Sequence, residues 1–219
     1  DKDVRDRSES EEMRVFLGHL LADVQALERM LEEGRIESGV RRIGAEQELF
    51  LVDSHWRPAP IALEVLETVA DPHVTTELAL FNLEFNLDPL VFGDGCLRRM
   101  EADIDALLAR VRRAAAEHGA RAVLVGILPT LAKSDLELDK MTPDPRYRGL
   151  NDALTRLRGG DYEFYLKGVD ELHLHHGSIM VEACNASFQV HFQVSADEFA
   201  RVYNAAQAAT APVLAAAAN

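Results

Sequence analysis

The stretch "GAEQELFLVD" (residues 44–53) decides which fold this chain can adopt. Its apolar end predicts a β-strand over about 41–52, yet Glu46 and Glu48 stand two positions apart within that strand. Because side chains alternate between the two faces of a strand, both carboxylates lie on the same face. Like charges in that position repel each other, so the strand needs something that offsets the repulsion.

Two further segments carry polar side chains on one face in the same way. In "LFNLEFNLD" (80–88), Phe81, Leu83, Phe85 and Leu87 alternate with Asn82, Glu84, Asn86 and Asp88. In the third segment the polar face carries Ser187, Gln189, His191 and Gln193. If the three strands belong to one sheet, their polar faces form a common surface that includes Glu46, Glu48, Glu84 and His191.

Such a surface is suited to a cation. Clustered carboxylates are costly to desolvate unless a cation joins them, and oxygen ligands favour Mg²⁺ or Mn²⁺ over zinc. Because Mg²⁺ also takes substrate phosphates as ligands, the surface suits nucleotide phosphates, and Glu77 could add another carboxylate. An ordinary solvent-facing sheet carries the same residue types, so both interpretations stay open on the pattern alone.

Helices and strands are mixed along the chain without a regular βαβ order. Helices are predicted over 11–33, 61–70, 95–118 and 147–158, and a last one from Ser195, where Ser195 and Glu198 fit a capping box. Extended segments are predicted at about 74–88, 121–129, 170–182 and 186–194, with a loop over 130–146. The order favours an α+β fold with an antiparallel sheet.

Composition narrows the classes of partner. The 219 residues carry a formal charge of −14, from 23 basic and 37 acidic residues, which argues against nucleic acid or an anionic membrane as the partner. No apolar run approaches the roughly 20 residues that span a bilayer. Cys96 and Cys184 are far apart in the sequence, so we interpret them as reduced thiols and expect a cytoplasmic protein.

Two other groups are candidates for binding. His173, His175 and His176 could hold a transition metal, although histidines beside a turn glycine are often simply exposed. Arg146 and Arg148 flank Tyr147 and could clamp a carboxylate or phosphate, or serve only at the surface. The sequence contains no phosphate-binding GxxxxGK[ST] motif and no GxSxG or HExxH motif.

These motifs, in this order, resemble the glutamate–cysteine ligase and carboxylate–amine ligase family. "GAEQELFLVD" resembles its opening strand and "ELALFNLEFN" its second acidic strand. "GILPTL" and "RYRGLNDAL" resemble its strand end and Arg-Tyr segment, and the chain from Ala186 onward resembles its polar strand and the long helix that follows. The match runs from about Val40 to the end.

The resemblance implies a fold related to the catalytic domain of glutamine synthetase, a curved antiparallel sheet backed by helices. It also implies ATP-dependent joining of a carboxylate to an amine with Mg²⁺, or Mn²⁺ in its place. By matching position, it places Glu46, Glu48, Glu84 and Glu77 at the metals, and Gln189, His191 and Arg146 at the nucleotide and substrate.

We therefore expect residues 1–39 to form an N-terminal helical segment and 40–219 to form the N-terminal part of a ligase-like catalytic domain. Members of the family are longer, so we also expect a truncated chain that is inactive alone, and a homodimer is compatible with the resemblance. The expected reaction joins glutamate to an amine such as cysteine through an acyl phosphate, as in glutathione biosynthesis.

Two departures leave the amine open. Many bacterial members have Thr-His-Pro where this chain has Ile127-Leu128-Pro129, and some have His-Val-His at Gln189-Val190-His191. Two alternatives stand beside the ligase: a non-catalytic ligase-like domain that binds nucleotide or an amino acid, and a metal-dependent hydrolase that uses the carboxylates and the histidine trio.

Overall fold

A computed structural model describes residues 9–217, so the first eight positions of the predicted segment 1–39 lie outside the described residues. The chain divides into two compact units, one from Gly44 to His191 and one that combines the described residues up to Ile43 with those from Phe192 on. The helices are α1 (Glu9–Glu32), α2 (Ala62–Val69), α3 (Cys96–Glu117), α4 (Pro145–Arg158) and α5 (Phe199–Ala216), with 3₁₀ turns η1 (Lys133–Leu136), η2 (Leu138–Lys140) and η3 (Ile179–Cys184). The strands are β1 (Arg42–Val52), β2 (Val74–Thr76), β3 (Asn82–Asn86), β4 (Leu90–Val91), β5 (Arg121–Val123), β6 (Tyr162–Lys167), β7 (Glu171–His176) and β8 (Phe188–Phe192).

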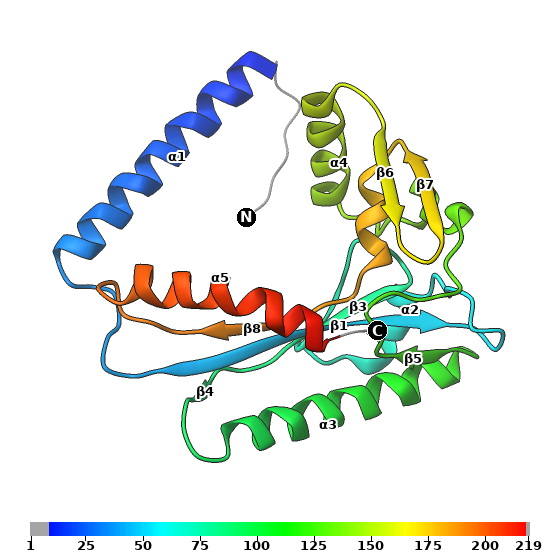
Figure 1. Ribbon diagram of the computed structural model, residues 1–219, viewed down its shortest axis with the longest axis horizontal. Helices are drawn as coiled ribbons and strands as arrows, with labels where there is room; N and C mark the ends of the chain where they lie inside the picture. The colour runs from blue at the N-terminus through cyan, green and yellow to red at the C-terminus, as the bar shows by residue number, and fades with distance from the viewer. Residues whose placement is uncertain (1–8, 218–219) are drawn as a thin grey trace. The chain divides into compact units, whose positions relative to one another are not determined.

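Strand β1 is the centre of a six-stranded sheet. The strand order is β2-β3-β1-β4, and β5 and β8 also pair with β1 (Figure 1). Strand β3 runs antiparallel to β1, with Glu48 opposite Glu84 and Leu49 opposite Leu83. Directly before β8, the Ser187 carbonyl accepts a hydrogen bond from the Glu48 amide at 3.0 Å. The three acidic or polar strands are therefore neighbours, and the predicted α+β fold with an antiparallel sheet and helices is confirmed.

The two faces of β1 pack against different layers. Leu49 and Leu51 point into a core with Leu83 and Phe85 of β3 and with the apolar stripes of α2 and α3. Helix α3 follows that face of the sheet in Figure 1. Phe50 and Val52 point to the opposite face, into a second core formed with the segments around α4 and η3. Since Glu46 and Glu48 share this second face, the strand is polar at one end of the face and apolar at the other.

Four details of the sequence prediction are wrong. Phe81 does not share a face with Leu83 and Phe85, because a turn closed by the Asn82 amide and Ala79 carbonyl precedes β3 and directs Phe81 into the second core. Residues 179–184 form η3 instead of a strand, and β6 was not predicted at all. Helix α5 begins at Phe199, and the Ser195 hydroxyl donates to the Glu198 carboxylate at 3.1 Å instead of capping the helix.

The unit that contains the two terminal helices is joined by polar contacts. Arg42 forms an ion pair with Glu37 at 2.6 Å, and its guanidinium also donates to the Gln193 side chain at 2.7 Å. Arg41 pairs with Glu198 at 2.6 Å. None of the helices within residues 9–217 combines the length and apolar character needed to cross a bilayer.

Phe50 offers a test of the two-faced strand. Its side chain is fully buried and stacks on Phe81 at a centroid distance of 6.4 Å. Replacing Phe50 with alanine should lower the free energy of unfolding by about 3–5 kcal/mol, because it removes buried contacts and leaves a cavity. Leu157→Ala, at a site that is 84% exposed, should change it by less than about 0.5 kcal/mol. Urea unfolding measures both, and equal effects would contradict this packing.

Candidate metal and substrate site

Three carboxylates from separate segments converge on the sheet. Glu48 lies on β1, Glu84 lies directly opposite it on β3, and Glu77 follows the last residue of β2. Each offers an oxygen within 4.8 Å of the others. The register of β1 and β3 fixes the first two, and the pairing of β2 with β3 delivers the third. The sheet therefore builds an all-oxygen group from residues that the sequence analysis assigned to a metal.

Strand β8 orients one of these carboxylates. The Ser187 amide and hydroxyl donate to the two oxygens of Glu48 at 2.8 and 2.9 Å, and the Gln189 amide nitrogen approaches the same side chain at 3.5 Å. These hydrogen bonds from neutral donors fix the orientation of the Glu48 carboxylate without bringing a competing cation to it. Gln189, predicted to face the site, does contact it.

Glu84 has a strongly raised pKa, to which burial and the neighbouring carboxylates both contribute. Burial raises the pKa of Glu84 to about 7, with further contributions from a hydrogen bond shared with Glu77 and from the charges of Glu77 and Glu46. Without a cation, the raised pKa favours the protonated form of Glu84, and protonation lessens the repulsion between the carboxylates.

A small cavity lies beside the carboxylates, and one of its lining residues carries an unsatisfied acceptor. Its volume is about 100 Å³, and its lining includes Glu48, Glu77, Asn82 and two residues that the sequence analysis missed, Glu182 and Asn185. The Asn82 side chain is 3% exposed, and its carbonyl oxygen has no hydrogen-bond partner. A buried carbonyl without a donor is costly, and a hydrated cation would satisfy it.

Glu182 and Asn185 carried no detectable signal in the sequence. Glu182 lies in η3, at the end of a segment that was predicted as a strand, and Asn185 directly follows η3 between two predicted strands. The alternation of side chains along a strand therefore could not assign either residue to a face of the sheet. The 3₁₀ turn carries Glu182 to the cavity, while the buried Ile179 and Met180 anchor the same turn in the second core.

Glu46 and His191 lie outside this group of three. The His191 Nε2 atom is 3.6 Å from a Glu46 oxygen, with the side chains 53% and 27% exposed. Glu46 is two residues from Glu48 on the same face of β1, and it lies opposite Asn86 on β3. Its charge still contributes to the raised pKa of Glu84. The structure thus places these two residues beside the group as a separate pair, of which His191 is exposed.

Arg146 lies close enough to this group for the charge of Glu77 to contribute, after that of Tyr147, to its raised pKa. Its guanidinium donates to the Tyr147 hydroxyl at 2.7 Å and lies over that ring at 4.6 Å. The Tyr147 phenol has a raised pKa, chiefly because of burial and next because of the charge of Glu77. Glu77 and Tyr147 also line a pocket of about 440 Å³, which shares Glu77, Leu78 and Glu182 with the small cavity. A site for a small molecule therefore adjoins the carboxylates.

The predicted histidine trio divides between two environments. His173 and His175 gather with Glu163 on the β6–β7 hairpin, in a group distinct from Glu48, Glu77 and Glu84. His176 is buried on the other face of β7 and contacts the Ser178 carbonyl at 3.1 Å.

One comparison with known proteins identifies the family. The sequence model of glutamate-cysteine ligase family 2 (GCS2) matches residues 42–219, which is most of the chain. The chain belongs to this family. Comparisons with curated proteins and with solved structures find no match.

Membership in glutamate-cysteine ligase family 2 confirms the resemblance drawn from the motifs and points to ligase-like chemistry. The matched region begins at the first residue of β1, so it contains the three converging strands, the small cavity and the larger pocket. The acidic group is thus a feature of the part of the chain that defines the family.

Glu84 predicts how stability depends on pH without metal. The pKa of Glu84 is raised from 4.5 to about 7 in the folded protein. Between these two pH values the folded protein holds a proton that the unfolded chain has lost, so the free energy of unfolding falls as the pH rises from 4.5 to about 7. In the presence of a chelator, Glu84→Gln should remove this loss and stabilise the fold above pH 7 by on the order of 1 kcal/mol after solvent screening.

Urea unfolding at several pH values measures this effect. Glu101→Gln, an exposed change on α3, is the matched control and should follow the wild type. A Glu84→Gln protein that is no more stable than the wild type above pH 7 would contradict the repulsion.

Proposed function

We propose that the chain carries the metal and nucleotide site of an ATP-dependent carboxylate–amine ligase, with glutamate and an amine such as cysteine as substrates. The observation that supports this most is the convergence of Glu48, Glu77 and Glu84 within 4.8 Å in a member of glutamate-cysteine ligase family 2. A cluster of this kind has no use in apolar packing, since it costs stability unless a cation neutralises it.

The residues present fit Mg²⁺, or Mn²⁺ in its place. Three carboxylates supply hard oxygen ligands, and Asn82 and Glu182 line the adjoining cavity. No thiol or imidazole belongs to the group, so the donor set disfavours zinc and copper. When bound, the ions would supply charge neutralisation for phosphoryl transfer.

The rest of the site has roles that its positions suggest. Ser187 and Gln189 hold Glu48 in place, which keeps the ligand geometry fixed before ATP arrives. Arg146, beside Tyr147 and Glu77, is the side chain available to neutralise a phosphate or substrate carboxylate that enters the pocket of about 440 Å³. Apolar and aromatic side chains line much of that pocket and would limit the access of water.

The proposed reaction has two steps. In the first, an oxygen of the glutamate side-chain carboxylate attacks the γ-phosphorus of ATP, the bond to the bridging oxygen breaks, and ADP leaves. In the second, the amine nitrogen attacks the acyl phosphate carbon, inorganic phosphate leaves, and the nitrogen loses a proton as the amide forms. No protein nucleophile is needed, so positioning and charge neutralisation are the contributions required of the protein.

Of the two alternatives, the structure supports the hydrolase less and does not separate the non-catalytic domain from the ligase. A hydrolase that combines the carboxylates with the histidine trio would need both in one site, whereas His173 and His175 gather with Glu163 instead. A non-catalytic domain that binds nucleotide would use the same carboxylates, and only turnover distinguishes it from a ligase.

Glu48 provides the test. Glu48→Gln should weaken Mn²⁺ binding, followed by electron paramagnetic resonance, by at least about tenfold, because a direct ligand matters more than an outer-shell partner. In the longest natural polypeptide that contains this chain, the same change should abolish formation of ADP and γ-glutamyl product from ATP, Mg²⁺, glutamate and cysteine. Glu101→Gln is the control for both measurements.

Two results would overturn the proposal in different ways. Unchanged Mn²⁺ affinity in Glu48→Gln would remove the metal site. If nucleotide binds with Mg²⁺ but no ADP is released from glutamate with any amine, the proposed metal site is retained. The ligase activity is then rejected in favour of the non-catalytic domain.

A further inference from the structure

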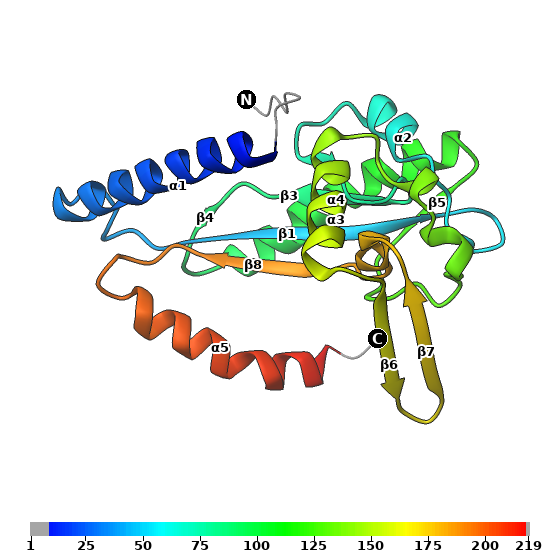
Figure 2. The same cartoon turned by 90° about the horizontal axis from the view of Figure 1, so that it is seen from above.

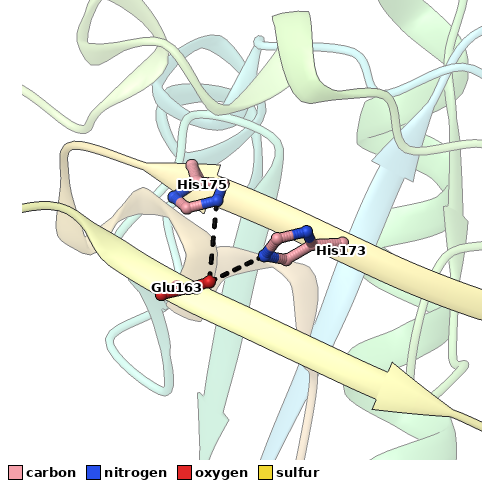
Figure 3. A group of neighbouring side chains, drawn as sticks. All are labelled: Glu163, His173 and His175. Atoms are coloured by element: carbon pink, nitrogen blue, oxygen red, sulfur yellow. Dashed lines mark hydrogen bonds and ion pairs between the residues drawn. The ribbon is translucent and has the colours of Figure 1, made fainter.

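The β6–β7 hairpin carries a second group of potential metal ligands. Glu163 on β6 is directly opposite His175 on β7, and His173 lies two positions from His175 on the same face. Figure 3 shows both imidazole rings turned toward the Glu163 carboxylate. Two imidazoles and a carboxylate from neighbouring strands thus meet on one surface of the hairpin.

The distances within this group are close to those of a metal site. The His173 Nε2 atom lies 2.8 Å from a Glu163 oxygen, and the His175 Nε2 atom lies 3.7 Å from the same oxygen. The three ligand atoms are all within 4.8 Å of one another, and the two rings are 4.7 Å apart. Ligands of a tetrahedral zinc ion are roughly 3.4 Å apart, given bonds of about 2.0–2.2 Å, so small side-chain rotations would close the site.

The hairpin is only partly packed: Tyr162 contacts the second core, whereas several of its large apolar side chains are exposed. It forms a separate two-stranded sheet, and Figure 2 shows it extending away from the six-stranded sheet. Tyr165 and Leu166 on β6 are each 59% exposed, and Leu172 on β7 is 50% exposed. An isolated two-stranded hairpin is only marginally stable in water. A metal ion bonded to a residue of each strand would link β6 to β7 on the exposed face of the hairpin, where side-chain packing contributes little to stability.

We propose that Glu163, His173 and His175 bind a divalent first-row transition metal, for which Zn²⁺ is the probe. Imidazole and carboxylate ligands suit zinc, and the donor set differs from the all-oxygen group that suits Mg²⁺. The protein supplies three ligands, and the exposure of all three residues leaves a fourth position open to water or another small ligand. The site is independent of the ligase proposal, because it uses none of the same residues.

The decisive experiment is a Zn²⁺ titration of the full chain in competition with a chromogenic chelator, with Mg²⁺ in excess. The wild type should bind one Zn²⁺ ion. The double variant His173→Ala/His175→Ala should bind that ion more than about 100-fold more weakly, because loss of direct ligands lowers the affinity more than loss of an outer-shell partner does. His55→Ala, which removes an exposed histidine elsewhere, should bind like the wild type. Equal Zn²⁺ affinity in the wild type and the double variant would overturn the proposal and leave an ordinary ion pair between His173 and Glu163.

Hydrogen exchange gives a readout that does not depend on removing the histidines. Zn²⁺ should slow exchange of the β6 and β7 amides by at least about tenfold in the wild type, because the ion links both strands. Glu163→Gln, which keeps the size of the side chain, should lose most of that effect while circular dichroism shows an intact fold. Slowed exchange confined to other parts of the chain would contradict a site on the hairpin.

Discussion

The mutual repulsion of Glu48, Glu77 and Glu84 is the constraint around which the sheet is organised. Direct pairing of Glu48 with Glu84 across β1 and β3 is unfavourable in an antiparallel sheet, where opposite charges or neutral pairs stabilise. Burial strengthens the penalty and raises the pKa of Glu84 to about 7. The rest of the strand pairing must therefore hold the register against this repulsion, and a bound cation would convert the penalty into binding energy.

The two cores explain how the register survives. Directly beyond the acidic positions, Phe50 and Val52 continue the same face of β1 into a core with α4 and η3, while Leu49 and Leu51 fill the core under α2 and α3. A slip of one residue would move every one of these side chains to the wrong face. The acidic end of β1 is thus fixed by the apolar end of the same strand, and the pocket lined by Tyr147 lies where the second core meets the carboxylates.

The parts of the site that alternation can describe were predictable, and the parts that depend on turns were not. Glu48, Glu84 and Gln189 lie on strands whose period of two residues assigns them to one face, and the structure brings them together. Glu182 and Asn185 reach the cavity from a 3₁₀ turn, and Phe81 enters the second core from a tight turn. Such turns follow from tertiary packing, which a local pattern does not contain. The group of Glu163 and two histidines could not be predicted either, because it depends on strand β6. Most residues of β6 are exposed, so no alternation of apolar and polar residues marks this strand in the sequence.

The central claim is that the three carboxylates bind a divalent cation, and anomalous X-ray diffraction from crystals of the protein soaked with Mn²⁺ tests it most directly. We predict an anomalous peak within bonding distance, roughly 2.0–2.2 Å, of oxygens from Glu48, Glu77 and Glu84, with the cavity beside Asn82 filled by the ion or its waters. Full occupancy of Mn²⁺ elsewhere, with no peak between these three carboxylates, would contradict the claim.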